Sequence, residues 1–254
     1  MQILAESLRV SLFASVPFDI RQIPLEEWWR AVGGGEPEQV ARNLSNFQLT
    51  ADGPYSKGRL FLGVTQGRAD WQATPPTPTA DGSAPPHFDA WPVSVGPFVQ
   101  QISEWLPAFK SLRRLAFGAV LRVPVLDRSC GYKTIETALS ELAIDLPDDL
   151  SDFLLQMNRP TQSTKLAGMT INRVSRWSVA LFRQVWFQLT LSAAASTTVS
   201  SGLPDVPEDF AVRIELDFNT AAEWAEDLQG AKPAALLNEL SESAIDYLMA
   251  RIAT

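Results

Sequence analysis

The chain holds a single histidine, His87, and a single cysteine, Cys130, so few of its side chains suit acid–base or nucleophilic catalysis. A serine or cysteine hydrolase needs a nucleophile and a base within about 3 Å of each other. His87 lies in the proline-rich stretch 74–92, whose composition predicts an extended loop. Arg128 and Lys133 could lower the pKa of Cys130, but no second cysteine accompanies it. We therefore predict no catalytic residue, with His87 on a surface loop and Cys130 as a structural or incidental thiol.

Carboxylates are the remaining candidates for metal chemistry, because the chain lacks the Cys and His clusters of zinc sites. Three aspartates between residues 148 and 152 could hold Mg²⁺, yet acids after a proline are also typical of a helix N-terminus. Glu215 and Asp217 share one face of an expected strand and could form a paired-carboxylate site, but Arg213 on that face favours a solvated or ion-paired surface. The run Gly33–Gly35 lacks the spacing of a phosphate-binding loop. The sequence therefore predicts no metal and no cofactor.

Alternation of apolar and polar residues predicts that strands form most of the regular structure. The clearest strand is Phe210–Phe218, where every second residue is apolar. Such alternation is typical of an antiparallel sheet with one wet face and not of a buried parallel sheet. We expect further strands at residues 8–14, 46–50, 59–65, 69–73, 115–125, 170–179 and 185–191.

Apolar residues at helical spacing predict a smaller number of helices. The stripe over residues 95–112 contains Pro107, which should end the helix there. The last helix begins near Pro233 and runs toward the C-terminus with one apolar side. Its solvated side is expected to carry Glu239, Glu242 and Asp246. We expect the other helices at residues 25–32, 135–142 and 150–157.

Strands closed by amphipathic helices indicate the α+β class, with a mainly antiparallel sheet and the helices packed on one of its faces. Residues 1–112 and 113–254 each run from strands to a closing helix, so we expect two similar halves or one continuous domain. The stretches 74–92 and 193–208 are expected loops, either functional or disordered, and their composition favours disorder.

The net charge of the chain disfavours some classes of binding partner. The 254 residues carry 21 Lys and Arg against 29 Asp and Glu, and the net charge of −8 disfavours nucleic acid and anionic membranes. The middle segment, residues 110–183, is basic, with 11 basic and 7 acidic side chains. No apolar run reaches the roughly 18 residues of a membrane helix, and no signal-peptide pattern opens the chain. With one cysteine, the expected compartment is the cytoplasm.

Eight tryptophans suggest aromatic contacts with a partner. Trp186 lies opposite Val185 and Phe187 on its expected strand, and an exposed tryptophan is a typical anchor of protein interfaces. Cover by another part of the same chain would explain Trp186 equally well. The candidate binding residues are Trp186, Arg183, Trp28, Trp29, Arg173 and Arg176.

The order of features in the second half carries a resemblance. A helix with ISEWLPAF precedes the strand RRLAFGAVLRVPV, a helical pair ending in QMNRP, the strand RIELDFNT and a terminal helix. In this order residues 95–254 resemble a sporadically distributed family of uncharacterised bacterial proteins. The resemblance implies no known reaction and no catalytic residues, and the patchy distribution of the family suggests mobile or defence-associated genes.

We therefore favour a bacterial, cytoplasmic binding or adaptor protein without catalysis of its own, which acts through protein–protein contacts as a hetero- or homo-oligomer. A bacterial defence or mobile-element system is its expected setting. Two alternatives stay open. One is a nucleic-acid-binding component that uses residues 110–183, and the other is a carboxylate-dependent metalloenzyme.

Overall fold

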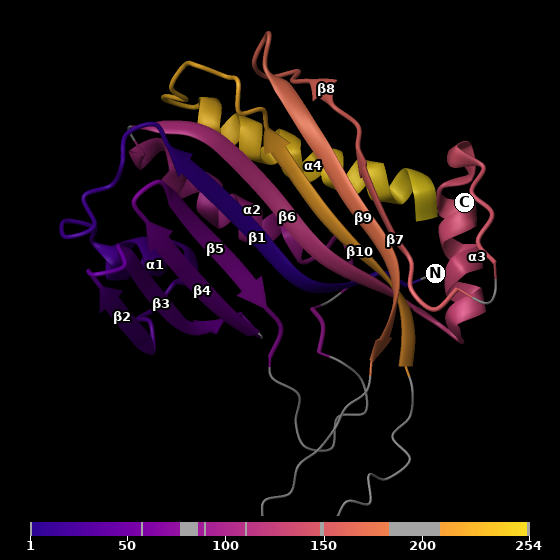
Figure 1. Cartoon of the computed structure of the whole chain (residues 1–254). Coiled ribbons are helices and arrows are strands. Elements are labelled where there is room, and N and C mark those ends of the chain that lie inside the picture. The colour runs from indigo at the N-terminus through magenta and orange to yellow at the C-terminus, as the bar shows by residue number, and fades with distance from the viewer. Residues whose placement is uncertain are drawn as a thin grey trace, which may run out of the picture.

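The computed structural model describes residues 2–56, 58–76, 86–88, 90–109, 111–147, 150–182 and 209–252. In these residues the chain forms a ten-stranded sheet, in which every strand pair is antiparallel, and four α-helices (Figure 1). The predicted α+β class with a mainly antiparallel sheet is confirmed. No helix in this part of the chain has both the length and the apolar character of a membrane span.

The strands lie in the order β2-β3-β4-β5-β1-β6-β10-β9-β7, and β8 also pairs with β9. Their bounds are β1 Leu4–Ala14, β2 Gln39–Asn43, β3 Gln48–Tyr55, β4 Gly58–Thr65, β5 Arg68–Thr74, β6 Leu112–Val125, β7 Leu154–Asn158, β8 Thr161–Gln162, β9 Thr170–Phe182 and β10 Asp209–Thr220.

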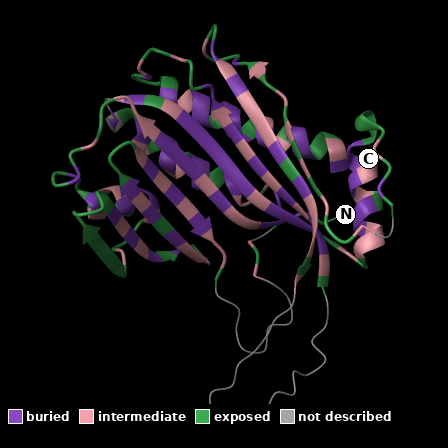
Figure 2. Cartoon of the chain, viewed as in Figure 1, coloured by how far each residue is buried: buried purple, intermediate pink, exposed green. Residues whose placement is uncertain are grey.

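The helices are α1 Leu25–Gly33, α2 Val95–Trp105, α3 Arg128–Ala138 and α4 Lys232–Ile252, with short 3₁₀ turns at Leu106–Ala108 and Ser140–Leu142. In Figure 1, α1, α2 and α4 lie behind the sheet, and α4 packs against α2, β6 and β10. Buried side chains from strands and helices form one hydrophobic core, and Figure 2 shows buried and less buried residues alternating along the strands. This alternation follows from the two-residue period of a strand.

The two predicted halves of the chain, residues 1–112 and 113–254, meet in the middle of the sheet. β1 pairs with β6, and the predicted boundary between residues 112 and 113 falls at the start of β6. Among the described residues, the order strand, helix, four strands, helix occurs twice, first from β1 to α2 and then from β6 to α4. In both stretches the last strand pairs with the first, β5 with β1 and β10 with β6.

Most predicted elements are found close to their expected positions. The strands expected in residues 8–14, 59–65, 69–73, 115–125, 170–179 and 210–218 are confirmed as parts of β1, β4, β5, β6, β9 and β10. Pro107 ends α2 as predicted, because the chain continues after Trp105 only as a 3₁₀ turn. The expected helices at 25–32 and from Pro233 are confirmed as α1 and α4.

Two expectations are wrong. Residues 154–158 form β7 and no helix, because Leu155 and Met157 turn toward the core with a two-residue period and the strand pairs with β9. Glu239 is not on a solvated face, since it is only 9% exposed and accepts hydrogen bonds from Ser163 and Thr164. Helical spacing alone does not show which loop will cover a helix.

Other expectations fall partly or wholly outside the described residues. The predicted strand 185–191 and the stretch 193–208 lie outside them, as do Arg183 and Trp186. The same holds for residues 77–85 and 89 of the stretch 74–92, and for Asp148 and Asp149. The sequence patterns also missed β2, whose five residues are all exposed and therefore carry no alternation.

Candidate binding face

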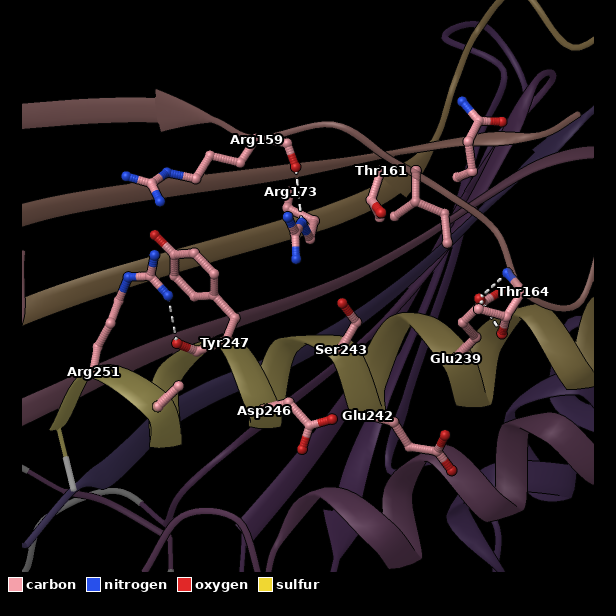
Figure 3. Close-up of a pocket in the computed structure, with 13 residues that line it drawn as sticks. Arg159, Thr161, Thr164, Arg173, Glu239, Glu242, Ser243, Asp246, Tyr247 and Arg251 are labelled. Carbon is pink, nitrogen blue, oxygen red and sulfur yellow. Dashed lines mark hydrogen bonds between the residues drawn. The ribbon is translucent and has the colours of Figure 1, made fainter. Parts of the chain in front are cut away.

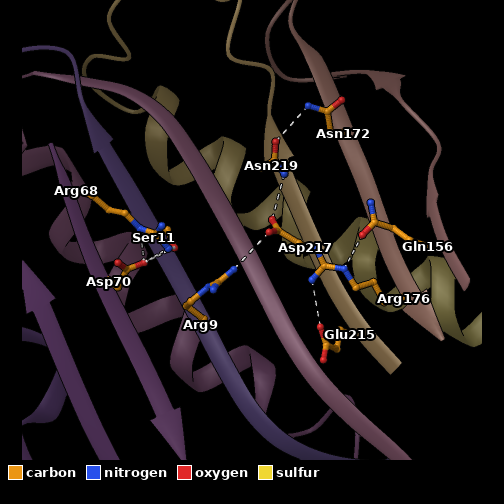
Figure 4. A network of polar contacts seen from close by, with 10 residues as sticks. All are labelled: Arg9, Ser11, Arg68, Asp70, Gln156, Asn172, Arg176, Glu215, Asp217 and Asn219. Carbon is orange, nitrogen blue, oxygen red and sulfur yellow. Dashed lines mark hydrogen bonds and ion pairs between the residues drawn. The ribbon is translucent and has the colours of Figure 1, made fainter. Parts of the chain in front are cut away.

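The two sides of each central strand differ in chemistry. On β1, Leu8, Val10 and Leu12 are buried in the core, while Arg9 and Ser11 point to the opposite side of the sheet. We call this opposite side the polar face (Figure 4). The polar side chains that Figure 4 draws on this face come from β1, β5, β7, β9 and β10, and Arg213 shares the side of Glu215 on β10: Arg9, Ser11, Arg68, Asp70, Gln156, Asn172, Arg176, Arg213, Glu215, Asp217 and Asn219.

A row of three residues crosses the middle of the polar face. Arg9 on β1 stands opposite Gly118 on β6, which stands opposite Asp217 on β10. A Cβ atom on Gly118 would lie 3.4 Å from Nη2 of Arg9 and 3.3 Å from the carbonyl oxygen of Leu216. Because glycine has no side chain, Arg9 can lie across β6 and reach Asp217, with Nη2 3.4 Å from Oδ2.

This crossing leaves a shallow hollow of about 150 Å³ at the centre of the face. Its lining includes Ser7, Gln72, Val120, Val174 and Arg176. The hollow therefore spans side chains from β1, β5, β6, β9 and β10, and both central strands contribute to it.

On the β5 side, hydrogen bonds and ring contacts fix the polar side chains. Ser11 Oγ donates to Asp70 Oδ1 at 2.5 Å, and Arg68 donates to the same oxygen through Nε at 2.9 Å and Nη2 at 2.7 Å. The ring of Phe13 lies between two guanidiniums, with that of Arg68 5.1 Å and that of Arg114 4.9 Å from its centroid. The aromatic ring stabilises both cations through its face.

On the β10 side, the two candidate carboxylates are committed to ion pairs. Glu215 pairs with Arg213 and, at 3.3 Å, with Arg176. Asn219 donates to Asp217, which also pairs with Arg9. The interpretation of Glu215 and Asp217 as an ion-paired surface is thus confirmed.

At one end of the face, Arg122 is only 3% exposed and lies 3.9 Å from Glu6 Oε1, and Arg213 lies 3.7 Å from Glu6 Oε2. Burial lowers the pKa of the Arg122 guanidinium, and the carboxylates of Glu6 and Asp209 oppose that shift. Nδ1 of His87 lies 3.1 Å from Nη2 of Arg122. His87 is exposed, and this contact ties it to β6 of the sheet.

The candidate binding residues that the structure describes lie in different parts of the molecule. Arg176 lies on the polar face, whereas Arg173, three residues earlier on the strand, points to the other side toward α4. Trp29 is 1% exposed, and its indole donates to the carbonyl of Leu60 at 3.3 Å, so it is a core residue. Trp28 is half-buried in an aromatic cluster with Phe18, Trp105 and Phe109. No common surface joins these residues.

Of the residues that build the centre of the polar face, the sequence singled out Glu215, Asp217 and Arg176 but not their partners on β1 and β5. Arg9, Ser11, Arg68 and Asp70 were missed, although each alternates with apolar core residues on its strand. That alternation was the available signal. Gly118 carries no such signal, because its role depends on the neighbouring strands.

Neither nucleophilic nor metal chemistry gains support from the geometry. The hydrogen bond with Asp127, burial and the Asp127 charge raise the pKa of the Cys130 thiol. Asp127 also caps α3 by accepting from the backbone N–H of Cys130 at 2.7 Å. Within the described residues, no group of three or more His, Cys, Asp or Glu side chains is placed to share a metal ion.

Comparison with known proteins gives no family: no protein-family model matches the chain, and no curated protein matches it.

Proposed function

We propose that this protein is a non-catalytic binding or adaptor protein that recognises another protein through its polar face. The layer of ion pairs that runs across β5, β1, β6, β10 and β9 supports this proposal. Because rigid strands hold the arginines and their partners in place, little side-chain conformational freedom is lost when a partner binds. Alternating positive and negative groups select a protein surface with the complementary pattern.

A partner can reach the polar face if all four helices cover the opposite side of the sheet. We propose that they do, because Gly131 of α3 faces Val179, which shares a strand side with the buried Trp177. The repeated order of elements further supports two similar halves joined at β1 and β6. The central hollow would then lie where the two halves meet.

We place this activity in the bacterial cytoplasm, with a hetero- or homo-oligomeric complex as the working form. The setting in a defence or mobile-element system rests on the resemblance alone.

Purification of the tagged protein from its native host, followed by mass spectrometry of co-purifying proteins, tests the proposal. The decisive variant exchanges the central pair, Arg9→Asp with Asp217→Arg, which keeps an ion pair across Gly118 but reverses its polarity. We expect the variant to melt near the wild type and to recover at least about tenfold less partner. Arg113→Gln, an exposed arginine at the start of β6, is the matched control.

Recovery of the same partner by the charge-exchanged variant would show that the partner binds elsewhere. Recovery of the wild type only as a free monomer, under several conditions, would count against any partner.

A nucleic-acid-binding role is the second candidate, because Arg114, Arg122 and Arg176 of the basic segment face the same side as Arg9. We favour a protein partner because Arg9, Arg68 and Arg176 each have a carboxylate within ion-pair distance, which leaves less positive charge for phosphates. Salt-dependent retention on DNA or RNA would support the second candidate, and no retention at low salt would remove it.

The carboxylate metalloenzyme is the third candidate, and Asp148 and Asp149 lie outside the described residues. A rise in melting temperature with Mg²⁺ or Mn²⁺ would support it, since a ligand that binds the folded state stabilises it.

A further inference from the structure

A second site lies on the other side of the sheet, between α4 and strands β8 and β9 (Figure 3). This space, which we call the α4 groove, has a volume of about 490 Å³. That volume lies within the roughly 300–1,000 Å³ that is typical of sites for small molecules. None of the residues that line the groove belongs to the polar face, so an inference about it does not rest on the proposed function.

One row of side chains on α4 faces the groove. Glu239, Ser243 and Tyr247 follow one another at intervals of four residues, so they lie along the same side of the helix. Figure 3 shows this row on the side of the strands, whereas the carboxylates of Glu242 and Asp246 lie on the side of α4 turned away from them. The short side chain of Ser243, between two longer neighbours in the row, leaves the middle of the groove open.

The side chains that reach into the groove from the strands follow from the pairing of β9 with its neighbours. The backbone N–H of Arg159 donates to the carbonyl of Arg173 at 3.1 Å, so these two residues lie opposite each other and share one side of the sheet. Thr161 stands opposite Ile171, which lies two residues before Arg173 and therefore on the same side of β9. Arg159, Thr161 and Arg173 thus all face α4.

The end of the groove nearest the C-terminus of α4 carries more positive than negative charge. Oε1 of Glu141 accepts from Arg159 at 2.9 Å and from Arg251 at 3.0 Å, so one carboxylate is shared by two guanidiniums. At the opposite end, the carboxylate of Glu239 is engaged by two hydrogen bonds from Thr164. An anion in the groove would therefore lie next to an excess of cationic groups.

Arg173 adds a third guanidinium, which has donors to spare. Its Nε donates to the carbonyl of Arg159 at 2.8 Å, and the guanidinium extends toward α4 (Figure 3). Among the described residues, the Arg173 side chain makes no other hydrogen bond and no ion pair, so Nη1 and Nη2 are available to a ligand. The hydroxyls of Thr161 and Ser243 also make no hydrogen bond within this part of the chain. Free donors thus reach the groove from β8, β9 and α4.

We propose that the α4 groove binds a small phosphomonoester through its phosphate group. Nη1 and Nη2 of Arg173 would donate to two phosphate oxygens, a geometry that suits the planar guanidinium. The hydroxyls of Thr161 and Ser243 would donate to the other oxygens, since a tetrahedral phosphate can accept from several sides at once. Arg159 and Arg251 would add to the attraction for the negative charge. The rest of the groove leaves room for the organic part of the ligand.

Calorimetric titration and thermal melts of the full chain test this proposal. The probes are glycerol 3-phosphate, phosphoserine, phenyl phosphate and inorganic phosphate, with sodium acetate and sodium chloride at equal ionic strength as controls. We expect at least one monoester to bind with one-to-one stoichiometry and to raise the melting temperature. Acetate should bind at least about tenfold more weakly, because a planar carboxylate engages fewer of the donors. Inorganic phosphate should also bind more weakly than that monoester, because it fills only part of the groove.

Variants then assign the site. Arg173→Gln should weaken binding of the monoester by about tenfold or more, and the surface variant Arg113→Gln should leave it unchanged. Ser243→Ala, which favours the helix and removes one neutral donor, should weaken binding by about two- to tenfold and serves as a second variant in case Arg173→Gln does not fold.

Three results would overturn the proposal. The first is failure of every phosphate probe to bind at millimolar concentration, and the second is wild-type affinity in both Arg173→Gln and Ser243→Ala. The third is inorganic phosphate that binds as tightly as the best monoester, which would remove the organic part of the ligand from the assignment.

Discussion

Replacement of Glu239 by glutamine should destabilise the protein in a way that depends on pH. The carboxylate accepts hydrogen bonds from Ser163 Oγ at 2.5 Å, from the Thr164 backbone N–H at 2.5 Å and from Thr164 Oγ1 at 2.8 Å. Burial opposes ionisation, but these hydrogen bonds outweigh it and hold the pKa of Glu239 below its ordinary value of 4.5. The ionised carboxylate is therefore the form that fixes the 163–166 loop to α4.

The size of the effect follows from the contacts that are lost. A glutamine keeps one acceptor oxygen and places an NH₂ donor where the second carboxylate oxygen accepts. Hydrogen bonds to a charged group contribute roughly 1.5–3 kcal/mol. We expect the free energy of unfolding to fall by about 2 kcal/mol, which lowers the melting temperature by about 4–8 °C in a protein of this size.

The loss of stability in Glu239→Gln should depend on pH in a known direction. Because the folded-state pKa of Glu239 is depressed, its stabilisation is fully present above the unfolded value of 4.5 and is lost as the pH falls through the folded value. The difference in stability between wild type and Glu239→Gln should therefore be largest at neutral pH. It should shrink as the medium is made more acidic than pH 4.5.

Urea unfolding and thermal melts at neutral and acidic pH measure both quantities. Glu242→Gln, one turn further along α4 and without a hydrogen bond among the described residues, is the control and should melt near the wild type. If Glu239→Gln also melts with the wild type at neutral pH, the loop is not held by this carboxylate and the reasoning is refuted.

The remaining predictions concern residues singled out from the sequence. Trp29→Ala should lower the free energy of unfolding by about 3–5 kcal/mol, and Trp28→Ala by clearly less because its ring is only half-buried; urea titrations separate the two. Cys130 should react slowly with a thiol reagent near neutral pH, since its pKa is raised, and Asp127→Asn should speed that reaction by removing the carboxylate whose hydrogen bond and charge raise that pKa. An unchanged labelling rate in Asp127→Asn would show that Asp127 does not control the thiol.

Much of the fold could be predicted from local patterns because the strands alternate cleanly. Phe210–Phe218 shows its apolar side at every second residue, and in the structure Val212, Ile214, Leu216 and Phe218 on that side are buried, with the ring of Phe218 5.6 Å from that of Tyr247 on α4. Prediction failed where tertiary contacts decide whether a segment forms a helix or a strand. Leu150–Met157 has apolar residues at helical spacing, yet pairing with β9 makes residues 154–158 a strand. Exposed β2 shows no pattern at all.

The candidate site was predicted less well, for a related reason. An ion pair between Arg9 and Asp217 joins residues 208 positions apart, and it depends on the absence of a side chain at Gly118. No local pattern contains that information. Trp29 was selected for its residue type, but its position on the apolar side of α1 places it in the core.

Hydroxyl-radical footprinting of the complex with the co-purified partner most directly tests whether the polar face is the binding surface. Phe13, between Arg68 and Arg114 on that face, should become protected from oxidation when the partner binds. Met249, 39% exposed on α4, should be oxidised equally with and without the partner. Protection of Met249 with unchanged oxidation of Phe13 would contradict the account.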